Sequence, residues 1–169
     1  MDSEIVNRVA ASALEVFDLE DYYPDGRRIS LDLAQWLEEG LILREKPFRE
    51  ALKNHDWSSY QKAYVALFCS TDAIVPAWAT ILVATHLNEY ARRVVSGSLE
   101  DIDTELYAEI LPQIDYEAYR DKPVIIKGCS RKPVPTSAYL MAASHLQRVA
   151  KSIMYGEACS AVPLYKRKS

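Results

Sequence analysis

The sequence predicts an α/β protein with a single domain and a mixed sheet. The parallel core of this sheet is expected to consist of repeats of a strand, a Cys-Ser loop and a helix, with further helices on its flanks. Two observations support this class. Apolar runs typical of buried strands precede two of the three cysteines, and alanine-rich helical sequences follow the same two cysteines. A strand, a crossover helix and a second strand in this order favour parallel pairing.

Each of the three cysteines begins a similar short motif. A serine follows the cysteine directly, and a Val-Pro pair comes a few residues later. The motifs run from Cys69-Ser70 to Val75-Pro76, from Cys129-Ser130 to Val134-Pro135, and from Cys159-Ser160 to Val162-Pro163. We therefore expect the three cysteines to occupy similar places in the fold.

Two of these motifs head a longer internal repeat. Residues 64–68 before Cys69 align with residues 124–128 before Cys129, and the segments after the two prolines align without a gap. Proline at the first turn of a helix loses no hydrogen bond, so both later segments are expected to be helices. The identical pairs in these segments are Ala79/Ala138, Ala84/Ala143, His86/His145, Leu87/Leu146 and Ala91/Ala150.

The same patterns give an order of elements along the chain. We divide the domain 1–169 into an N-terminal α/β part (1–60), the internal repeat (61–95 and 121–151) and a C-terminal strand and tail (152–169). Apolar spacing, proline positions and glycine breaks place the elements. Helices are expected at 4–13, 32–39, 47–54, 76–95, 99–119 and after Pro135, and strands at 14–23, 29–31, 41–43, 63–68, 123–127 and 151–155.

Composition narrows the function classes. The 169 residues are 49% hydrophobic and 26% charged, enough for a substantial core without disulfides or structural metals. A net charge of −4 argues against a nucleic-acid-binding protein. The chain has no run of about 20 apolar residues and begins with the acidic stretch 1–4, so we expect neither membrane spanning nor export. We expect a cytoplasmic protein, with its oligomeric state open.

The cysteines predict a metal centre. Residues that follow parallel strands lie along one edge of the sheet, about 4.8 Å apart for neighbours, and thiolates are preferred ligands of zinc and iron–sulfur clusters. We therefore predict that Cys69, Cys129 and Cys159 bind one zinc ion or iron–sulfur cluster. Asp72 is the expected fourth ligand because it lies in the Cys69 loop, although it could instead cap the next helix. Glu157 is a weaker candidate.

Other interpretations of the same residues stay open. Free cysteines are often simply buried as small apolar side chains. A second hypothesis is a thiol-dependent enzyme or sulfur acceptor, in which Cys69 is the nucleophile and Asp72 accepts its proton. A third is a non-catalytic scaffold that uses the acidic stretch 100–105 as a contact surface, against the simpler view of that stretch as a solvated helix face.

The remaining glycines and histidines do not indicate a cofactor or a catalytic site. The five glycines form no phosphate-binding loop or dinucleotide motif, so no nucleotide cofactor is expected. His86 and His145 lie far along their helices from the cysteine loops, and we interpret them as packing residues. His55 fits a helix end, where a cation is favoured.

Four segments carry a resemblance to a known family: 17–24 (Phe-Asp-Leu-Glu-Asp-Tyr-Tyr-Pro), 54–57 (Asn-His-Asp-Trp), 72–76 (Asp-Ala-Ile-Val-Pro) and 152–157 (Ser-Ile-Met-Tyr-Gly-Glu). Together they resemble the bacterial domain-of-unknown-function family 2480 over essentially the whole chain. The resemblance implies a cytoplasmic single-domain protein and supplies no established activity or ligand residues. It also implies a link to iron–sulfur assembly proteins as partners, because the family's genes are associated with those of sulfur mobilisation.

Overall fold

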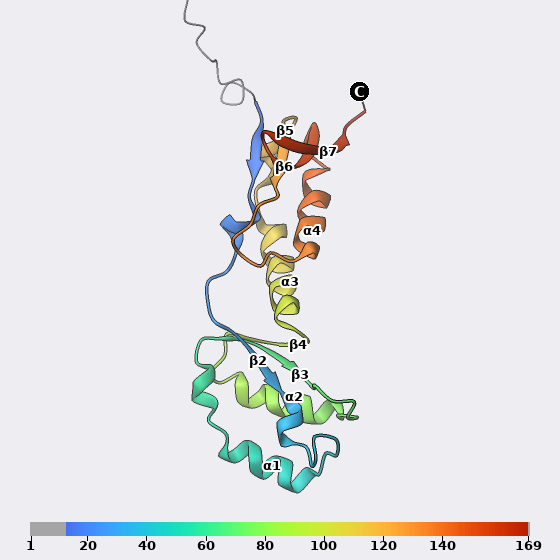
Figure 1. Ribbon diagram of the computed structural model, residues 1–169. Coiled ribbons are helices and arrows are strands. Elements are labelled where there is room, and N and C mark those ends of the chain that lie inside the picture. Colours follow the sequence, from blue (N-terminus) through green and yellow to red (C-terminus); the bar gives the residue numbers. More distant parts are fainter. Residues whose placement is uncertain (1–12, 169) are drawn as a thin grey trace, which may run out of the picture. The chain divides into compact units, whose positions relative to one another are not determined.

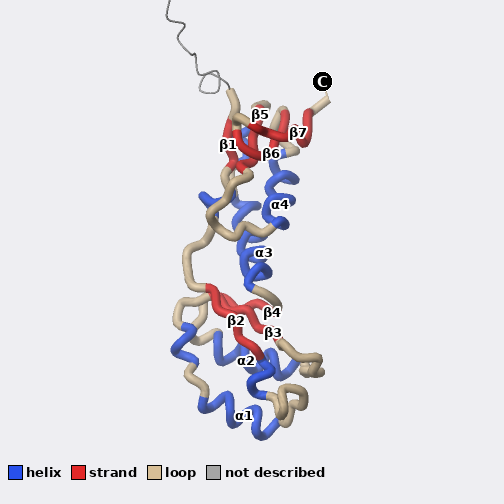
Figure 2. Tube along the Cα trace, in the orientation of Figure 1, coloured by secondary structure: helices blue, strands red, loops and turns tan. Residues whose placement is uncertain are grey.

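The computed structural model describes residues 13–168 and confirms the α/β class with parallel strands. The strands form two sheets, with the orders β1-β5-β6-β7 and β2-β3-β4 (Figures 1 and 2). The strands are β1 (Glu15–Phe17), β2 (Arg28–Asp32), β3 (Tyr64–Phe68), β4 (Arg93–Ser96), β5 (Pro123–Lys127), β6 (Ser152–Glu157) and β7 (Ser160–Lys166).

Four α-helices and five short 3-10 helices connect these strands in the described part of the chain. The α-helices are α1 (Glu45–Asn54), α2 (Ala77–Leu87), α3 (Leu99–Ile110) and α4 (Thr136–Leu146). The 3-10 helices are η1 (Leu19–Tyr22), η2 (Leu33–Trp36), η3 (Trp57–Tyr60), η4 (Leu111–Gln113) and η5 (Tyr116–Tyr119).

The chain divides into two compact units. Unit 1 combines the segment up to Tyr23 with the segment from Leu106 onward, and unit 2 is the continuous segment Pro24–Glu105. The sheet β1-β5-β6-β7 belongs to unit 1, and the sheet β2-β3-β4 belongs to unit 2. In the sequence, unit 2 therefore interrupts unit 1 after η1, and the second boundary falls within α3.

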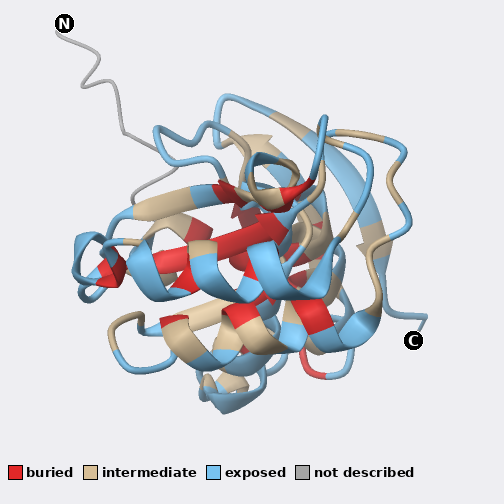
Figure 3. Ribbon diagram, turned by 90° about the horizontal axis from the view of Figure 1, so that it is seen from below, coloured by how far each residue is buried: buried red, intermediate tan, exposed pale blue. Residues whose placement is uncertain are grey.

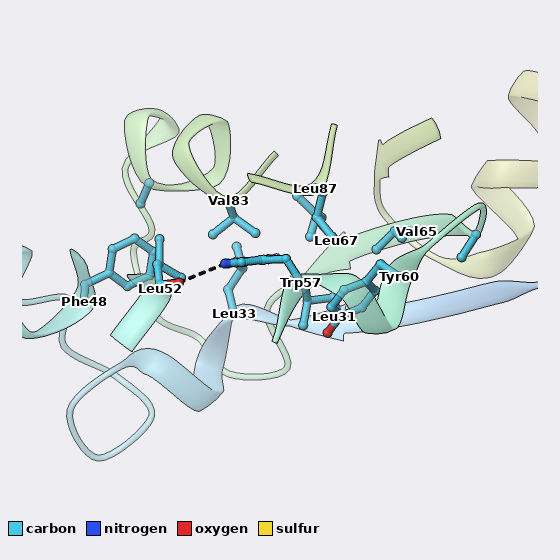
Figure 4. Close-up of a cluster of buried hydrophobic side chains, with 12 residues drawn as sticks. Leu31, Leu33, Phe48, Leu52, Trp57, Tyr60, Val65, Leu67, Val83 and Leu87 are labelled. Atoms are coloured by element: carbon cyan, nitrogen blue, oxygen red, sulfur yellow. Dashed lines mark hydrogen bonds between the residues drawn. The ribbon is translucent and has the colours of Figure 1, made fainter. Parts of the chain in front are cut away.

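Unit 2 is a three-stranded parallel sheet with β3 in the centre. The alternation of side chains along β3 points Val65 and Leu67 into a cluster that also contains Val83 and Leu87 of α2. Trp57 closes this cluster, and its indole Nε1 donates a hydrogen bond of 2.8 Å to the carbonyl of Leu52 (Figure 4).

Unit 1 places β5 between β1 and β6 in parallel and adds β7 antiparallel to β6. Phe17, Ile126 and Ile153 lie on one face of this sheet and pack with Ala142 and Leu146 of α4. In Figure 3 the buried residues, drawn in red, lie on strands and on parts of helices. Each unit therefore has its own apolar core.

The two units repeat the same order of elements. The helix α4 follows α2 at a separation of 59 residues (136 minus 77), and the same separation relates β5 to β3 and η5 to η3. Lys62 and Asp121 also share it, and both have positive φ angles, 58° and 59°. Their amides donate to the carbonyls of Tyr90 and Val149, again 59 residues apart. The internal repeat thus spans a strand, its preceding 3-10 helix and the following helix without a gap.

This register corrects the alignment of the cysteines. At a separation of 59, Val65 matches Val124, and both face the core of their unit. The alignment anchored on the cysteines would match Val65 with Ile125, which lies on the opposite face of β5, because a shift of one residue turns a strand over. Cys69 therefore corresponds to Gly128, and Ser70 corresponds to Cys129.

Several other element predictions also differ from the structure. The helix expected at 76–95 ends at Leu87, and β4 follows within the same range because Val94 and Val95 favour a strand. The strand expected at 41–43 is reduced to one isolated bridge between Glu38 and Ile42. The strand β7 was not predicted, and the helix expected at 4–13 lies almost wholly outside the described residues.

Within residues 13–168, every helix is too short or too polar to cross a bilayer.

Candidate functional site

The prediction of one metal or cluster site built from the three cysteines is wrong. Cys69 belongs to unit 2, whereas Cys129 and Cys159 belong to unit 1. Across residues 13–168, no group of three or more His, Cys, Asp and Glu side chains is arranged to hold a metal ion. The physical reason is that the similar motifs occupy different places: Cys69 and Cys129 are one position out of register, and Cys159 lies in the tight turn between β6 and β7.

The loop after β3 contains Cys69 and Asp72, the second of which does not cap α2. The thiol is half-buried, and its Sγ lies 3.4 Å from Oγ1 of Thr71, which itself donates to the carbonyl of Gly40 at 2.5 Å. Asp72 is exposed, and no side chain caps the first turn of α2. The hydroxyl of Thr71 is thus the hydrogen-bond partner of this thiol, and the thiol-enzyme hypothesis stays a prediction.

The acidic stretch 100–105 lies in α3, where two of its four acidic residues, Asp101 and Asp103, have well-defined partners in unit 2. Asp101 accepts hydrogen bonds from the amide (2.6 Å) and the hydroxyl (2.8 Å) of Ser98, which forms a capping box at the start of α3. Asp103 is buried and pairs with Arg28 at 2.8 Å. Glu100, Asp101 and Glu105 are exposed, so the scaffold hypothesis stays a prediction.

The carboxyl edge of each sheet, where its parallel strands end, carries the remaining candidates. One feature is common to both edges. Asp18 in unit 1 and Asp32 in unit 2 each end the first strand and cap a 3-10 helix, through hydrogen bonds of 2.9 Å from the amides of Glu20 and Ala34. Because both copies use the aspartate in this way, its role at this position is structural.

In unit 2 this aspartate also holds the loop after β3. Ser70 donates to Asp32 from its amide at 3.0 Å and from its hydroxyl at 2.5 Å. Burial alone would raise the pKa of Asp32, but these bonds and the amide of Ala34 outweigh it and hold the pKa below its ordinary value. Nearby, an open hollow of about 340 Å³ is lined by uncharged residues, among them Phe68 and Leu99.

In unit 1 a different carboxylate holds the corresponding loop. Oε1 of Glu20 accepts from the Ser130 hydroxyl at 3.0 Å, from the Lys132 amide at 3.1 Å and from the Arg131 amide. The amide of Arg131 is the main reason that the pKa of Glu20 lies below its ordinary value. Glu20, and not Asp18, therefore holds the loop 129–132.

The second carboxylate oxygen of Asp18 instead pairs with Lys127, at 2.6 Å from its Nζ. This hydrogen bond and the charge of Asp18 raise the pKa of Lys127, with further contributions from Glu20 and Glu157. The ammonium group of Lys127 therefore lies within the field of three carboxylates.

Two tyrosines and a thiol complete this edge. The rings of Tyr139 and Tyr155 meet edge to face, with centroids 5.8 Å apart. Burial raises the pKa of Tyr139, and interactions with Tyr155, Asp18, Glu20 and the exposed Cys129 raise it further. Tyr139 and Tyr155 thus form an aromatic pair at this edge.

Two glycines allow the ends of β5 and β6 to approach closely. A Cβ atom on Gly128 would lie 3.1 Å from the Cα of Gly156 and 3.1 Å from the ring of Tyr155. Gly156 has a φ of 124°, a conformation that favours glycine. The glycines therefore bring the Tyr155 ring over the start of the Cys129 loop.

Glu157, the last residue of β6, contains the one exceptional polar atom of this edge. Its Oε1 is buried and accepts no hydrogen bond from any residue of the described chain. Buried carboxylate oxygens are almost always satisfied, so this atom is an exception among the polar atoms of the described residues.

Four side chains at the unit 1 edge, an ammonium group, two phenols and a carboxylate, are replaced 59 residues earlier in unit 2 by a phenyl ring and three aliphatic hydroxyls. The pairs are Lys127 and Phe68, Tyr139 and Thr80, Tyr155 and Ser96, and Glu157 and Ser98. We call Lys127, Tyr139, Tyr155 and Glu157 the edge residues. Apart from Glu157, sequence reasoning missed them, although an ungapped alignment of the two copies contains the signal.

The repeated histidines pack in both units, as expected. The ring of His86 stacks on Trp57 with centroids 5.0 Å apart, and that of His145 stacks on Tyr116 at 4.9 Å. His55 lies against Trp57 at 4.6 Å, and its Nε2 is 3.1 Å from the hydroxyl of Tyr60.

The fold and the two strand edges define an α/β protein made of two similar units. In unit 1 the carboxyl ends of the strands carry ionisable side chains, which the equivalent positions of unit 2 lack. A scan of family models matches residues 3–167 to the family described as protein of unknown function, DUF2480. The chain belongs to this family. The searches of curated proteins and of solved structures give no match.

Proposed function

We propose that this chain is a small-molecule-binding protein whose site is the carboxyl edge of the unit 1 sheet. The observation that carries the proposal is the difference between the two copies of that edge. Unit 2 has counterparts of β1, β5 and β6, of the capping aspartate and of α4, yet it has Phe68, Thr80, Ser96 and Ser98 at the positions of the edge residues. The fold can thus be built without an ammonium group, phenols and a carboxylate at these positions.

Location and chemistry support the same proposal. Open α/β sheets bind their ligands at the carboxyl ends of the strands. Clustered ionisable groups with shifted pKa values are typical of functional sites, because binding and catalytic groups need pKa values matched to their task. Lys127 and Tyr139 ordinarily keep their protons at neutral pH, and the upward shift of both pKa values acts in the same direction, so each can serve as a hydrogen-bond donor.

We place this function in the cytoplasm as part of the proposal. Three free thiols, two of them exposed, suit a reducing compartment. Association with iron–sulfur assembly proteins and the lack of a nucleotide cofactor stay predictions.

The test is capture of small molecules by the purified protein. The protein is incubated with a small-molecule extract of bacterial cells, separated by gel filtration, and its retained compounds are identified by mass spectrometry. We expect at least one compound that the native protein retains and that the Lys127→Met and Tyr139→Phe variants lose.

The chain offers matched controls at the equivalent positions of unit 2. Thr80→Ala and Ser96→Ala should retain the same compound as the native protein, and circular dichroism should show that all variants are folded. The proposal fails if no compound is retained, or if the unit 1 and unit 2 variants retain the same compounds.

A further inference from the structure

The outer face of α2 in unit 2 is apolar and uncharged. None of the 11 residues of this helix is Asp, Glu, Lys or Arg. Ala79, Val83 and Leu87 face the core, and Figure 4 shows Val83 and Leu87 within that cluster. A surface helix usually has charged residues on the face opposite its core residues, and a helix that is apolar on all sides is usually buried. The outer face of α2 is therefore expected to be covered.

Exposed apolar side chains gather at this face. Ile74, in the loop before α2, is 91% exposed, and Ile81, on the helix itself, is 61% exposed. Trp78 and Ile81 lie about one turn apart and, with Glu45 and Arg49 of α1, line an open hollow of about 480 Å³. We call these five residues the α1–α2 surface.

The equivalent face of unit 1 is less apolar. At a separation of 59 residues, Trp78 corresponds to Ser137, and Ile74 corresponds to Pro133. Ile81 corresponds to Leu140, which is 68% exposed. The helix α4 thus forms with a hydroxyl in place of the indole, so unit 1 gives no structural reason for the indole of unit 2.

Charge indicates which partner covers the α1–α2 surface. Its two charged residues are one acid and one base, Glu45 and Arg49, which pair at 2.9 Å. A strongly acidic or basic partner would be matched by a surplus of the opposite charge, which this pair does not provide. Two copies of a chain with a net charge of −4 repel each other, and a neutral contact surface minimises that repulsion.

A neutral pair beside an apolar stripe is also self-complementary. In a two-fold symmetric contact the same patch meets itself, so each acid needs a base within the same patch. We infer that the α1–α2 surface is the contact between two copies of this chain. Trp78 and Ile81 of one copy pack into the hollow of the other, and Glu45 of each copy pairs with Arg49 of the other.

Trp78 is preorganised for this role. Its ring meets that of Phe48 edge to face, with centroids 6.0 Å apart, and the guanidinium of Arg49 lies 5.4 Å from its centroid. Aromatic anchors held in place by neighbouring side chains are frequent centres of protein interfaces. The contact lies in unit 2 and goes beyond the small-molecule site proposed for unit 1.

The test is sedimentation velocity of the whole chain at a series of protein concentrations. For an interface at the small end of the known range, we expect a dimer with a Kd on the order of tens of micromolar. Ile81→Glu should weaken the dimer about tenfold or more, because it places an unpaired charge in the contact. Leu140→Glu makes a similar change at the equivalent position of unit 1 and should leave the Kd unchanged, and circular dichroism should show that both variants are folded.

Charge reversal tests whether the second copy is the partner. Glu45→Arg and Arg49→Glu should each weaken the dimer, because like charges then meet across the two-fold axis. An equimolar mixture of the two variants should restore it, since one copy then presents two bases and the other presents two acids. A mixture that stays monomeric would overturn the inference.

Three other outcomes would overturn it as well. The native chain could be monomeric at concentrations well above the expected Kd. In that case, binding to phosphatidylcholine vesicles would assign the surface to a membrane, and no binding would leave it to another protein. A dimer that Ile81→Glu does not weaken, or one that Ile81→Glu and Leu140→Glu weaken equally, would place the contact elsewhere. Compound capture tests the proposed function separately from all of these outcomes.

Discussion

The carboxyl ends of the strands in the two sheets have the same backbone arrangement but different side chains. In unit 2, Ser70 binds Asp32, and the positions equivalent to the edge residues are Phe68, Thr80, Ser96 and Ser98, with the carboxylate of Asp101 bound to Ser98. In unit 1, Glu20 rather than Asp18 accepts the hydrogen bond from Ser130, and Asp18 pairs with Lys127. The comparison separates residues that the fold itself uses from residues that one unit has added, because each position of unit 1 has an equivalent position in unit 2. Both copies use the capping aspartate, whereas only unit 1 has the edge residues.

The same comparison applies to the aromatic residue that precedes the central strand. Trp57 in unit 2 and Tyr116 in unit 1 both stack on the repeated histidine. The indole of Trp57 has its hydrogen-bond partner, the carbonyl of Leu52, whereas the buried hydroxyl of Tyr116 has no partner within the described chain. Packing is therefore repeated more faithfully than hydrogen bonding.

The largest effect is expected from the buried ion pair that unit 2 has and unit 1 lacks. Arg28 corresponds to Leu14 in unit 1, and its partner Asp103 has a side chain only 4% exposed. Asp103→Ala leaves the charge of Arg28 without its nearest partner and should lower the free energy of unfolding by about 3–5 kcal/mol. Urea denaturation measures this loss.

Glu105→Ala is the control for that prediction. Glu105 lies 3.8 Å from Arg93 with its side chain 52% exposed, so its loss should cost less than about 1 kcal/mol. Equal effects of the two substitutions would mean that burial of the Arg28–Asp103 pair does not set its contribution.

A smaller effect concerns pH. His55 corresponds to Ile114 in unit 1, and burial lowers the pKa of His55 against the opposing charge of Asp56. Because the folded-state pKa lies below the unfolded value of about 6.5, the unfolded state takes up the proton first. Stability is therefore fully present above about pH 6.5 and falls as the pH drops toward the folded-state pKa, by under about 1 kcal/mol for this partly exposed ring.

The matched variant His55→Ile installs the unit 1 residue and should remove this part of the pH dependence. Urea denaturation at a series of pH values between 5 and 8 measures it, and the carboxylates contribute equally to both proteins. An unchanged pH profile in His55→Ile would show that other groups cause the decline.

The smallest effect is expected at Tyr116. The hydroxyl is buried without a partner in the described chain, and burial raises the pKa of Tyr116 to about 12. Tyr116→Phe should leave the free energy of unfolding unchanged or raise it by a few tenths of a kcal/mol, because it removes an unsatisfied polar group. Trp57→Phe, which breaks the bond to Leu52, should lower it by about 1–2 kcal/mol. A clear loss in Tyr116→Phe would reveal a partner for the hydroxyl.

Much of the fold follows from local sequence patterns. The strand 123–127 was predicted with its observed bounds, and Asp32 and Pro47 were placed correctly at or near the starts of helices. The division of the strands into two sheets depends on long-range pairing, which apolar periodicity does not encode. The strand β4 was missed because Arg93 continues a helical pattern that the turn at 88–91 in fact ends.

The site was harder to predict than the fold. The cysteines drew attention because their motifs look alike, although one residue of register separates Cys69 from Cys129 and a hairpin turn holds Cys159. The buried face of a strand decides the register, and that face is known only when the core is known. Lys127 and Tyr139 carry no motif, so they become visible only against their counterparts Phe68 and Thr80.

The most direct test of the central claim is to give unit 1 the unit 2 residue at three of its four edge residues, with Lys127 kept because it pairs with Asp18. The variant Tyr139→Thr, Tyr155→Ser, Glu157→Ser installs the residues found 59 positions earlier, and its free energy of unfolding is measured by urea denaturation beside compound capture from the cell extract. We predict a folded protein whose stability differs from the native value by less than about 1.5 kcal/mol and which retains none of the captured compound. A loss on the order of 4 kcal/mol or more would contradict the account, because the edge residues would then belong to the structure of unit 1, and so would undiminished capture.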